Sequence, residues 1–192
     1  LTVVQGDLGD AAAIAQAVKA AQPHAVVDAS SALPSAAANQ NATANSANRA
    51  LVVEQTYAAL LADSRLAQCV LLLVGGQLIP EPGGSINSLP VAALAWSLRT
   101  FVAREQWRQA EDSLRWMFHD ADKEFRFVYA RLGYMVEEPS RGVLSPEPTL
   151  NNIQKGPASY CDVADAFCRL AADPDRTWER KAIFFNYHTN TK

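Results

Sequence analysis

Short apolar segments alternate along this chain with longer stretches whose apolar positions recur at the spacing of an α-helix. The segment Cys69–Val74 is apolar at every position. A continuous apolar run of this length is typical of a strand that is buried on both faces of a parallel sheet. The pattern predicts strands at residues 1–6, 25–29, 69–74, 125–130 and 182–185.

The stretches between these strands are predicted to be helices. Asp10 is placed to cap the first helix, which has one apolar face and ends at Pro23. A Ser-, Ala- and Asn-rich loop over residues 30–45 runs into the second helix, which continues through Leu61. The other two helices are expected at residues 91–118 and 161–172. Because strand and helix alternate throughout, we predict an α/β fold with a doubly wound parallel sheet, in one domain spanning residues 1–192.

Two segments are predicted to be irregular. Gly75-Gly76 is expected to stop the third strand, and a loop rich in proline and glycine follows it. Residues 137–157 contain four prolines. Irregular segments of this length in compact domains are usually functional. We therefore expect residues 139–157 to lie over the carboxyl ends of the strands as a mobile cover.

Composition narrows the class of protein. The chain has 192 residues, of which 49% are hydrophobic, and a formal net charge of -3. Without a basic run, this charge favours neither nucleic acid nor an anionic membrane surface as a partner. The longest apolar run is far shorter than the roughly 20 residues of a membrane-spanning helix. No signal or transit segment is evident, and the chain opens on a strand without a Met, so we expect a processed or partial chain.

The cysteines and histidines suggest no metal or disulfide site. The cysteines lack a CxxC pair and a neighbouring histidine cluster, so we expect them to be small buried residues of a protein in a reducing compartment, either cytoplasm or an organelle matrix or stroma. The histidines are expected on the surface or in loops. These residues are Cys69, Cys161, Cys168, His24, His119 and His188.

Five passages, in this order and spacing, carry a resemblance to a known family. They are Val4–Asp10, Ala25–Ser31, Glu111–Arg115, Phe127–Gly133 and Tyr160–Ala166. Together they resemble the NmrA-like group of atypical short-chain dehydrogenases/reductases, whose members have a Rossmann-like NAD(P)-binding fold. The resemblance covers nearly all of the chain, and its first passage is similar to the family's third strand.

The resemblance implies a nucleotide site near the first two passages. Asp7 would accept a hydrogen bond from the adenine amino group, and Leu8 would pack against the ring. Ala29, Ser30 and Ser31 stand where the family has a turn beside the ribose and phosphates of the cofactor. Turn chemistry is the alternative role for Asp7, and helix capping is the alternative for Asp10.

The resemblance also places Arg131 and Gly133 beside the nicotinamide, although Leu132 replaces the family's usual Pro. A plain turn at the end of the strand is the alternative there. The implied cofactor is NADP or NAD, and no metal is expected.

The family's phosphate-binding loop is absent, since no GxxGxxG or GxGxxG occurs in this sequence. If residues 1–6 are the third strand, the first two strands of the fold are absent as well. The family's strand order, 3-2-1-4-5-6-7, would then leave the third strand without a neighbour. We therefore expect an intact protein that is longer at its N-terminus or, as the alternative, a second chain that supplies the strands. Val3-Val4 is expected not to pair with Val26-Val27.

The family's catalytic pair is also absent. Its reductases use a Tyr as general acid and a Lys four residues later that stabilises the phenolate. None of the five tyrosines has Lys at that spacing. The corresponding positions hold Ala103 and Trp107, and residues 74–77 replace the family's strand-end serine. We therefore assign no catalytic residue.

Two classes of function follow. The first is an NAD(P)-binding protein without the usual catalytic residues, acting as a redox sensor, assembly factor or accessory subunit with protein partners in a larger complex. The alternative is an NAD(P)H-dependent reductase with an unrelated proton donor, for which Tyr134 and Arg131 are the nearest candidates. Four tryptophans would anchor a partner if exposed and would otherwise pack helices against the sheet. They are Trp96, Trp107, Trp116 and Trp178.

Overall fold

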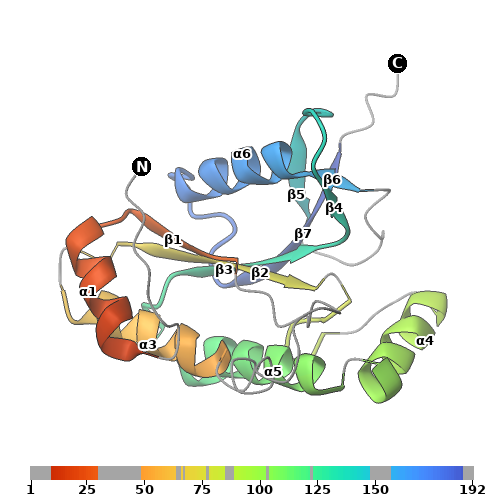
Figure 1. The fold of residues 1–192 in the computed structure, drawn as a ribbon, viewed down its shortest axis with the longest axis horizontal. Coiled ribbons are helices and arrows are strands. Elements are labelled where there is room, and N and C mark those ends of the chain that lie inside the picture. The colour runs from red at the N-terminus through yellow and green to blue at the C-terminus, as the bar shows by residue number, and fades with distance from the viewer. Residues whose placement is uncertain are drawn as a thin grey trace.

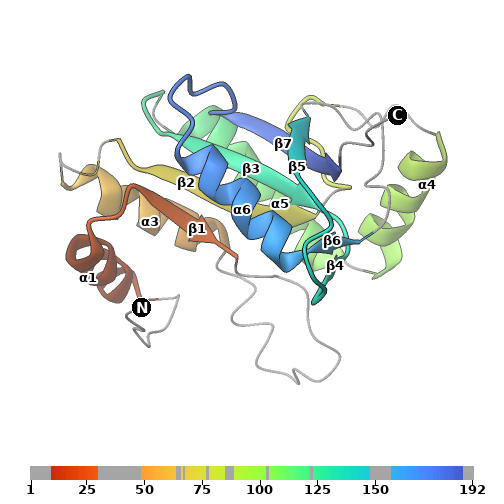
Figure 2. The same ribbon diagram turned by 90° about the horizontal axis from the view of Figure 1, so that it is seen from above.

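A central sheet lies between two layers of helices in the computed structural model (Figure 1). The structure describes residues 10–29, 49–63, 66, 68–76, 78–84, 89–102, 104–121, 123–147 and 157–187. Helices α3 (Arg49–Leu61) and α5 (Arg104–Arg115) cover one face, and α6 (Tyr160–Ala171) covers the other. Helix α1 (Ala11–Ala21) lies against α3, and α4 (Leu89–Ser97) lies at the opposite end of the molecule (Figures 1 and 2). This is the predicted α/β arrangement.

Four parallel strands form the main part of the sheet. They are β1 (Ala25–Asp28), β2 (Val70–Gly76), β3 (Phe127–Leu132) and β7 (Lys181–Tyr187). The order is β1-β2-β3-β7-β5, and the last strand, β5 (Leu144–Glu147), runs antiparallel to β7. Two short strands, β4 (Met135–Val136) and β6 (Ala158–Ser159), pair with each other beyond the end of β3.

The predicted parallel strands at Val26, Val70, Phe127 and Ile183 are therefore confirmed. The strand expected at residues 1–6, and with it the pairing of Val3-Val4, lies outside the described residues. Gly75 and Gly76 do not stop β2 as predicted, because they are its last two residues and pair with β3.

Alternation along the strands divides the core in two. On the α3 and α5 side, Leu71, Leu73, Phe127 and Tyr129 pack with helix residues such as Leu114. The intervening strand residues face α6. They include Leu72, Val128, Ala130 and Ile183, which pack with Phe167 of α6. All six residues of β3 are buried, as expected for a strand covered on both faces.

Helix α1 begins and ends where its sequence predicts. The Asp10 carboxylate accepts hydrogen bonds from the backbone N–H groups of Ala12 and Ala13, at 2.9 and 3.1 Å. This satisfies two of the donors that a helix N-terminus leaves without a partner. Gln22 then adopts a left-handed conformation, φ 44°, directly before Pro23. The capping role weighed for Asp10 is confirmed.

The helix expected over residues 91–118 is not continuous. Two five-residue π-helical segments, η2 (Leu98–Val102) and η3 (Trp116–Asp120), flank α5. A π turn adds a residue to the helical repeat and changes which side chains face the core. In α5 itself Trp107, Ala110 and Leu114 face the sheet. The hydrophobic pattern does not reveal such insertions.

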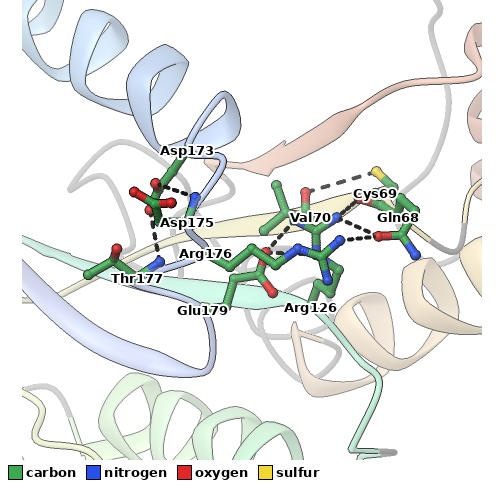
Figure 3. Close-up of polar contacts among 9 residues, drawn as sticks. All are labelled: Gln68, Cys69, Val70, Arg126, Asp173, Asp175, Arg176, Thr177 and Glu179. Carbon is green, nitrogen blue, oxygen red and sulfur yellow. Dashed lines mark hydrogen bonds and ion pairs between the residues drawn. The ribbon is translucent and has the colours of Figure 1, made fainter.

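A set of polar contacts ties together the amino ends of β2, β3 and β7 (Figure 3). Arg126 donates from Nε to the Glu179 carboxylate, at 2.7 Å, and from Nη1 to the Gln68 carbonyl. Arg176 donates to the Gln68 side chain at 2.5 Å. Asp173 orders the turn that leads into β7, because its carboxylate accepts hydrogen bonds from the backbone N–H groups of Asp175 and Thr177. Arg126, Glu179, Arg176 and Asp173 therefore each have a polar partner at this end of the sheet.

No helix within the described ranges is long and apolar enough to cross a membrane.

We predict that Gly75→Ala destabilises the protein and that Gly76→Ala does not. A Cβ on Gly75 would overlap the Tyr129 hydroxyl, whereas one on Gly76 would make ordinary contact with Ile79, at 3.6 Å. Overpacking of a core typically costs about 1–3 kcal/mol. Urea unfolding of both variants measures the two costs. Equal stabilities would show that Tyr129 moves freely and that the contact does not constrain the site.

Candidate functional site

The register of the parallel strands gathers three of the predicted site residues at one edge of the sheet. Asp28 is level with Leu73, and Gly75 is level with Arg131. Ala29, exposed directly after β1, therefore lies about 10 Å across the sheet from β3, given the usual strand spacing. Gly133 follows β3 directly. Open α/β sheets bind ligands at this edge, beyond the carboxyl ends of their strands.

Ala29, Arg131 and Gly133 thus share one edge, as a common ligand requires. Asp7, Leu8, Ser30 and Ser31, the other predicted cofactor residues, lie outside the described residues.

Arg131 is the most unusual residue at this edge. It is only 4% exposed, and among the described residues its side chain makes one hydrogen bond, from Nη2 to the Ala182 carbonyl at 3.4 Å. Its Nε is buried without a hydrogen-bond partner among the described residues. Burial lowers the pKa of the guanidinium, and the Glu81 carboxylate partly opposes this. Buried polar groups are rarely left in this state, so Arg131 calls for an explanation.

Glu81 is brought to this edge by a turn that the sequence specifies. Gly84 N–H donates to the Glu81 carbonyl at 2.8 Å, which closes a four-residue turn. Pro82 occupies its second position and Gly83, with φ 77°, its third, as in a type II turn. The loop after β2 therefore has a defined conformation within residues 78–84.

Gly75 leaves room for a neighbour of Arg131. Tyr129 lies two residues before Arg131 on β3, and its hydroxyl fills the space that a side chain on Gly75 would occupy. A serine cannot stand at this position without displacing the tyrosine. The packing thus gives a physical reason for glycine at one of the positions that replace the family's strand-end serine.

Trp107, which the sequence resemblance aligns with a family lysine, is turned away from solvent. It is buried in the α5-side core, and its Nε1 donates to Glu111 Oε1 at 3.1 Å. Glu111 also pairs with Arg99, 3.2 Å from its Oε2. The indole N–H is thus already satisfied within its own helix. Ala103 lies outside the described residues.

The two alternative proton donors differ in exposure. Tyr134 is 75% exposed just beyond the end of β3, whereas Arg131 is buried.

A buried carboxylate anchors the segment that follows β4. Asp162 accepts hydrogen bonds from Ser140 Oγ at 2.5 Å, from the Arg141 backbone at 2.9 Å and from the Tyr187 hydroxyl at 2.6 Å. Burial alone raises its pKa, but these hydrogen bonds outweigh burial and hold the pKa of Asp162 below its usual range. Tyr187 in turn accepts from the Ser159 backbone at 2.9 Å. The cluster fixes residues 140–141 to the start of α6.

Sequence reasoning missed this cluster, although a signal was present. Ser159 and Asp162 have the spacing of a capping box, in which the acidic residue bonds back to the first backbone N–H. Here the Tyr187 hydroxyl stands between them, accepting from Ser159 and donating to Asp162. The capping motif was readable, but the tyrosine comes from a strand that is distant in sequence.

The cover predicted over residues 139–157 is corrected in part. Residues 144–147 are not irregular but form β5, with Leu144 buried in the α6-side core. Pro146 is tolerated because β5 pairs with only one strand, β7, within the described sheet. Ser140 and Arg141 lie near the carboxyl end of β7, where Leu144 pairs with Tyr187. Residues 148–156 lie outside the described residues.

The cysteine prediction was right for Cys69 and wrong for the other two. Cys69 is buried, which raises the pKa of its thiol. Cys161 and Cys168 are exposed. The core-facing side of α6 holds Val163, Ala166, Phe167 and Leu170, and the two cysteines, seven residues apart, lie on the opposite side.

Two of the four tryptophans, Trp107 and Trp116, pack from helical segments as the helix-packing interpretation expected, whereas Trp178 lies in the turn before β7. Trp107 is buried, and Trp116 and Trp178 are half-buried against the two cores. Trp96 is 60% exposed and contacts the ring of Phe101, which is 73% exposed. No group of three potential metal ligands occurs within the described parts of the chain.

Asp162→Asn is predicted to destabilise the protein by about 1.5–3 kcal/mol, the usual worth of hydrogen bonds to a charged group. Asp165→Asn, on the exposed side of the same helix, is the control, because its pair with Arg169 is exposed and worth little. Folding lowers the pKa of Asp162. The carboxylate therefore makes its full contribution to the free energy of unfolding above about pH 4, which is its pKa in the unfolded chain. This contribution is lost as the pH falls through the lower pKa of the folded state.

Urea unfolding between pH 2 and pH 7 tests this prediction. The stability gap between wild type and Asp162→Asn should narrow only below about pH 4. A gap that is constant over the whole range would show that the carboxylate is not what holds residues 140–141.

Solved structures show what this fold is similar to. A short-chain dehydrogenase/reductase from Veillonella parvula, in complex with NADP, is 16% identical, with a TM-score of 0.60 over 98% of this chain and 73% of that chain. The anaerobillin reductase ChuY from Escherichia coli is 15% identical, with a TM-score of 0.60 over 97% of this chain and 75% of its own. The oxidoreductase YlbE from Lactococcus lactis is 13% identical, with a TM-score of 0.56 over 97% and 72%.

No family model matches the sequence, and no curated protein matches it closely enough to count as a relative. The likeness is therefore one of structure. The expected resemblance is confirmed at the level of the fold: the chain has a Rossmann-like α/β fold similar to that of solved short-chain dehydrogenases/reductases.

Proposed function

We propose that the protein binds NAD(P)(H) along the carboxyl edge of its sheet and acts as an accessory or redox-sensing protein rather than as a carbonyl reductase. The observation that carries the second half of this proposal is Trp107. By the sequence resemblance it stands at the family's lysine position, and in the structure it is buried and donates its N–H to Glu111.

The described residues at the edge suit a dinucleotide. Ala29 and Gly133 have small side chains that allow a ligand to approach the backbone. Arg131 supplies a cationic group with an unused donor. A similar fold holds NADP in the Veillonella parvula protein. In this proposal Asp7, Leu8, Ser30 and Ser31 complete the adenine and ribose side of the site.

The chemistry available beside the nicotinamide is limited. A carbonyl that accepts hydride becomes an alkoxide, which requires a proton donor or a fixed positive group within hydrogen-bond reach. In the family, a lysine keeps the donor tyrosine active. Trp107 cannot replace the lysine, because an indole is neutral and this one is already hydrogen-bonded. General acid catalysis typically contributes about 10²- to 10⁴-fold, so its loss leaves little turnover.

An NAD(P)H-dependent reductase is the second candidate, and Tyr134 is the observation that favours it. Its phenol is exposed just beyond β3, where a substrate over the nicotinamide would lie. One protein of similar fold is named a reductase. In this alternative Tyr134 donates the proton without a neighbouring lysine.

We predict that the purified protein binds NADPH or NADH but oxidises it at a negligible rate with carbonyl, quinone and flavin substrates. Binding is measured by calorimetry, and oxidation by the loss of nicotinamide absorbance. Failure of both cofactors to bind would refute the proposed site. Binding together with rapid oxidation would refute the accessory role.

Two matched variants identify the donor if oxidation is seen. Tyr134→Phe removes the phenol beyond β3, and Tyr160→Phe removes another exposed phenol, at the start of α6. A loss of about 10²-fold or more with Tyr134→Phe alone would establish the reductase alternative. Equal activity in both variants would exclude Tyr134 as the acid.

A further inference from the structure

Arg131 and Asn186 lie on neighbouring strands and face the same side of the sheet. Arg131 is level with Phe184 in the pairing of β3 with β7, and Asn186 comes two residues later on β7. Because side chains alternate along a strand, Phe184 and Asn186 share the α5-facing side with Arg131. The spacing of the strands puts the two Cα atoms about 8 Å apart.

Each of these side chains has a buried polar atom without a hydrogen-bond partner among the described residues. For Arg131 this atom is Nε, and for Asn186 it is Oδ1. Native structures contain few such atoms, and a ligand or water accounts for many of them. Two such atoms on adjacent strands near the carboxyl edge indicate that a polar group binds on this face of the sheet.

The charge of Arg131 indicates what kind of group this is. Arg131 is 4% exposed, and no carboxylate of the described residues lies within 4.0 Å of its guanidinium. Glu81 acts on it only through space, as a charge that partly offsets the effect of burial on its pKa. An isolated buried cation is costly, and an anion in direct contact removes most of that cost.

Asn186 is compatible with an anion. A half-turn of its amide puts the two N–H donors where Oδ1 now lies. Arg131 Nε and the Asn186 amide would then both donate to the same oxygen-bearing group. Glu81, held by its turn, discourages a second negative charge beside the first.

We propose that Arg131 and Asn186 form an oxyanion-binding site that takes one carboxylate or phosphate group of the ligand. The inference deepens the proposed function and rests on it only for the source of the anion. That source is either a phosphate of the dinucleotide or a carboxylate of a second ligand beside the nicotinamide.

The first experiment follows thermal unfolding of the protein in chloride, phosphate, pyrophosphate, acetate and succinate at matched ionic strength. The variants are Arg131→Met, which removes the charge, and Arg126→Met, which makes the same change at the opposite end of the sheet. A hundredfold excess of a bound anion over its Kd should raise the wild-type midpoint by about 5–10 °C. Arg126→Met should keep this increase and Arg131→Met should lose it.

A second readout separates binding from a merely structural role. In chloride, the midpoint of Arg131→Met should equal or exceed that of wild type, because the variant no longer buries an uncompensated cation. Arg126→Met should lower the midpoint, because it breaks the ion pair with Glu179. A larger fall for Arg131→Met than for Arg126→Met would overturn the proposal.

Asn186→Asp keeps the proposal testable if Arg131→Met does not fold. The new carboxylate would lie beside Arg131 and take the place of the anion, so the chloride midpoint should rise and the anion effect should disappear. A fall in the midpoint with an unchanged anion effect would contradict the proposal.

The anions also distinguish the two sources. Stabilisation by phosphate and pyrophosphate, together with weaker NADP binding in Arg131→Met, assigns the site to the dinucleotide. Stabilisation by acetate or succinate that persists in saturating NADP assigns it to a second ligand. If Arg131→Met loses the anion effect but the wild-type protein binds no dinucleotide, the proposed function is refuted and the oxyanion site stands. Equal effects in wild type and Arg131→Met would refute the oxyanion site alone.

Discussion

The parallel register of β1, β2 and β3 is the constraint on which the rest of this structure depends. Backbone pairing puts Asp28, Leu73 and Tyr129 level with one another, so the three strands end at one edge. The helices on both faces keep the sheet buried and its register fixed. Side chains that follow these strands therefore meet at the carboxyl edge, although they are far apart in sequence.

The two ends of the sheet differ in how fully their arginines are paired. At the amino end, Arg126 is paired with Glu179 and also donates to Gln68. At the carboxyl end, Arg131 is more deeply buried, and yet its side chain makes one long hydrogen bond within the described parts of the chain. Asp162 holds residues 140–141 near this edge by accepting hydrogen bonds from Ser140 and Arg141.

Periodicity predicted the fold well because its strongest signals are those of a buried parallel sheet. The runs at Val70 and Phe127 and the apolar faces of the helices needed no other information. Pattern reasoning failed where geometry depends on contacts distant in sequence. The hydrophobic pattern does not reveal the π turns beside α5. It also does not predict β5, because Leu144 packs into a core that other elements form.

The candidate site was predictable only in part. Arg131 and Gly133 could be chosen from a short passage similar to a known family. Asn186 and Glu81 could not, because one belongs to the last strand and the other to a turn, and only folding brings them towards Arg131. The exposure of Cys161 and Cys168 could have been predicted, since both lie opposite the apolar face of their helix.

Hydrogen exchange with and without NADPH tests most directly the claim that the carboxyl edge holds a dinucleotide. We expect NADPH to slow exchange at residue 29, in the loop at 78–84 and at residues 131–136, and to leave the amino-end turn at 173–180 unchanged. Slower exchange at the amino-end turn, or no change at the carboxyl edge under conditions where NADPH binds, would contradict it.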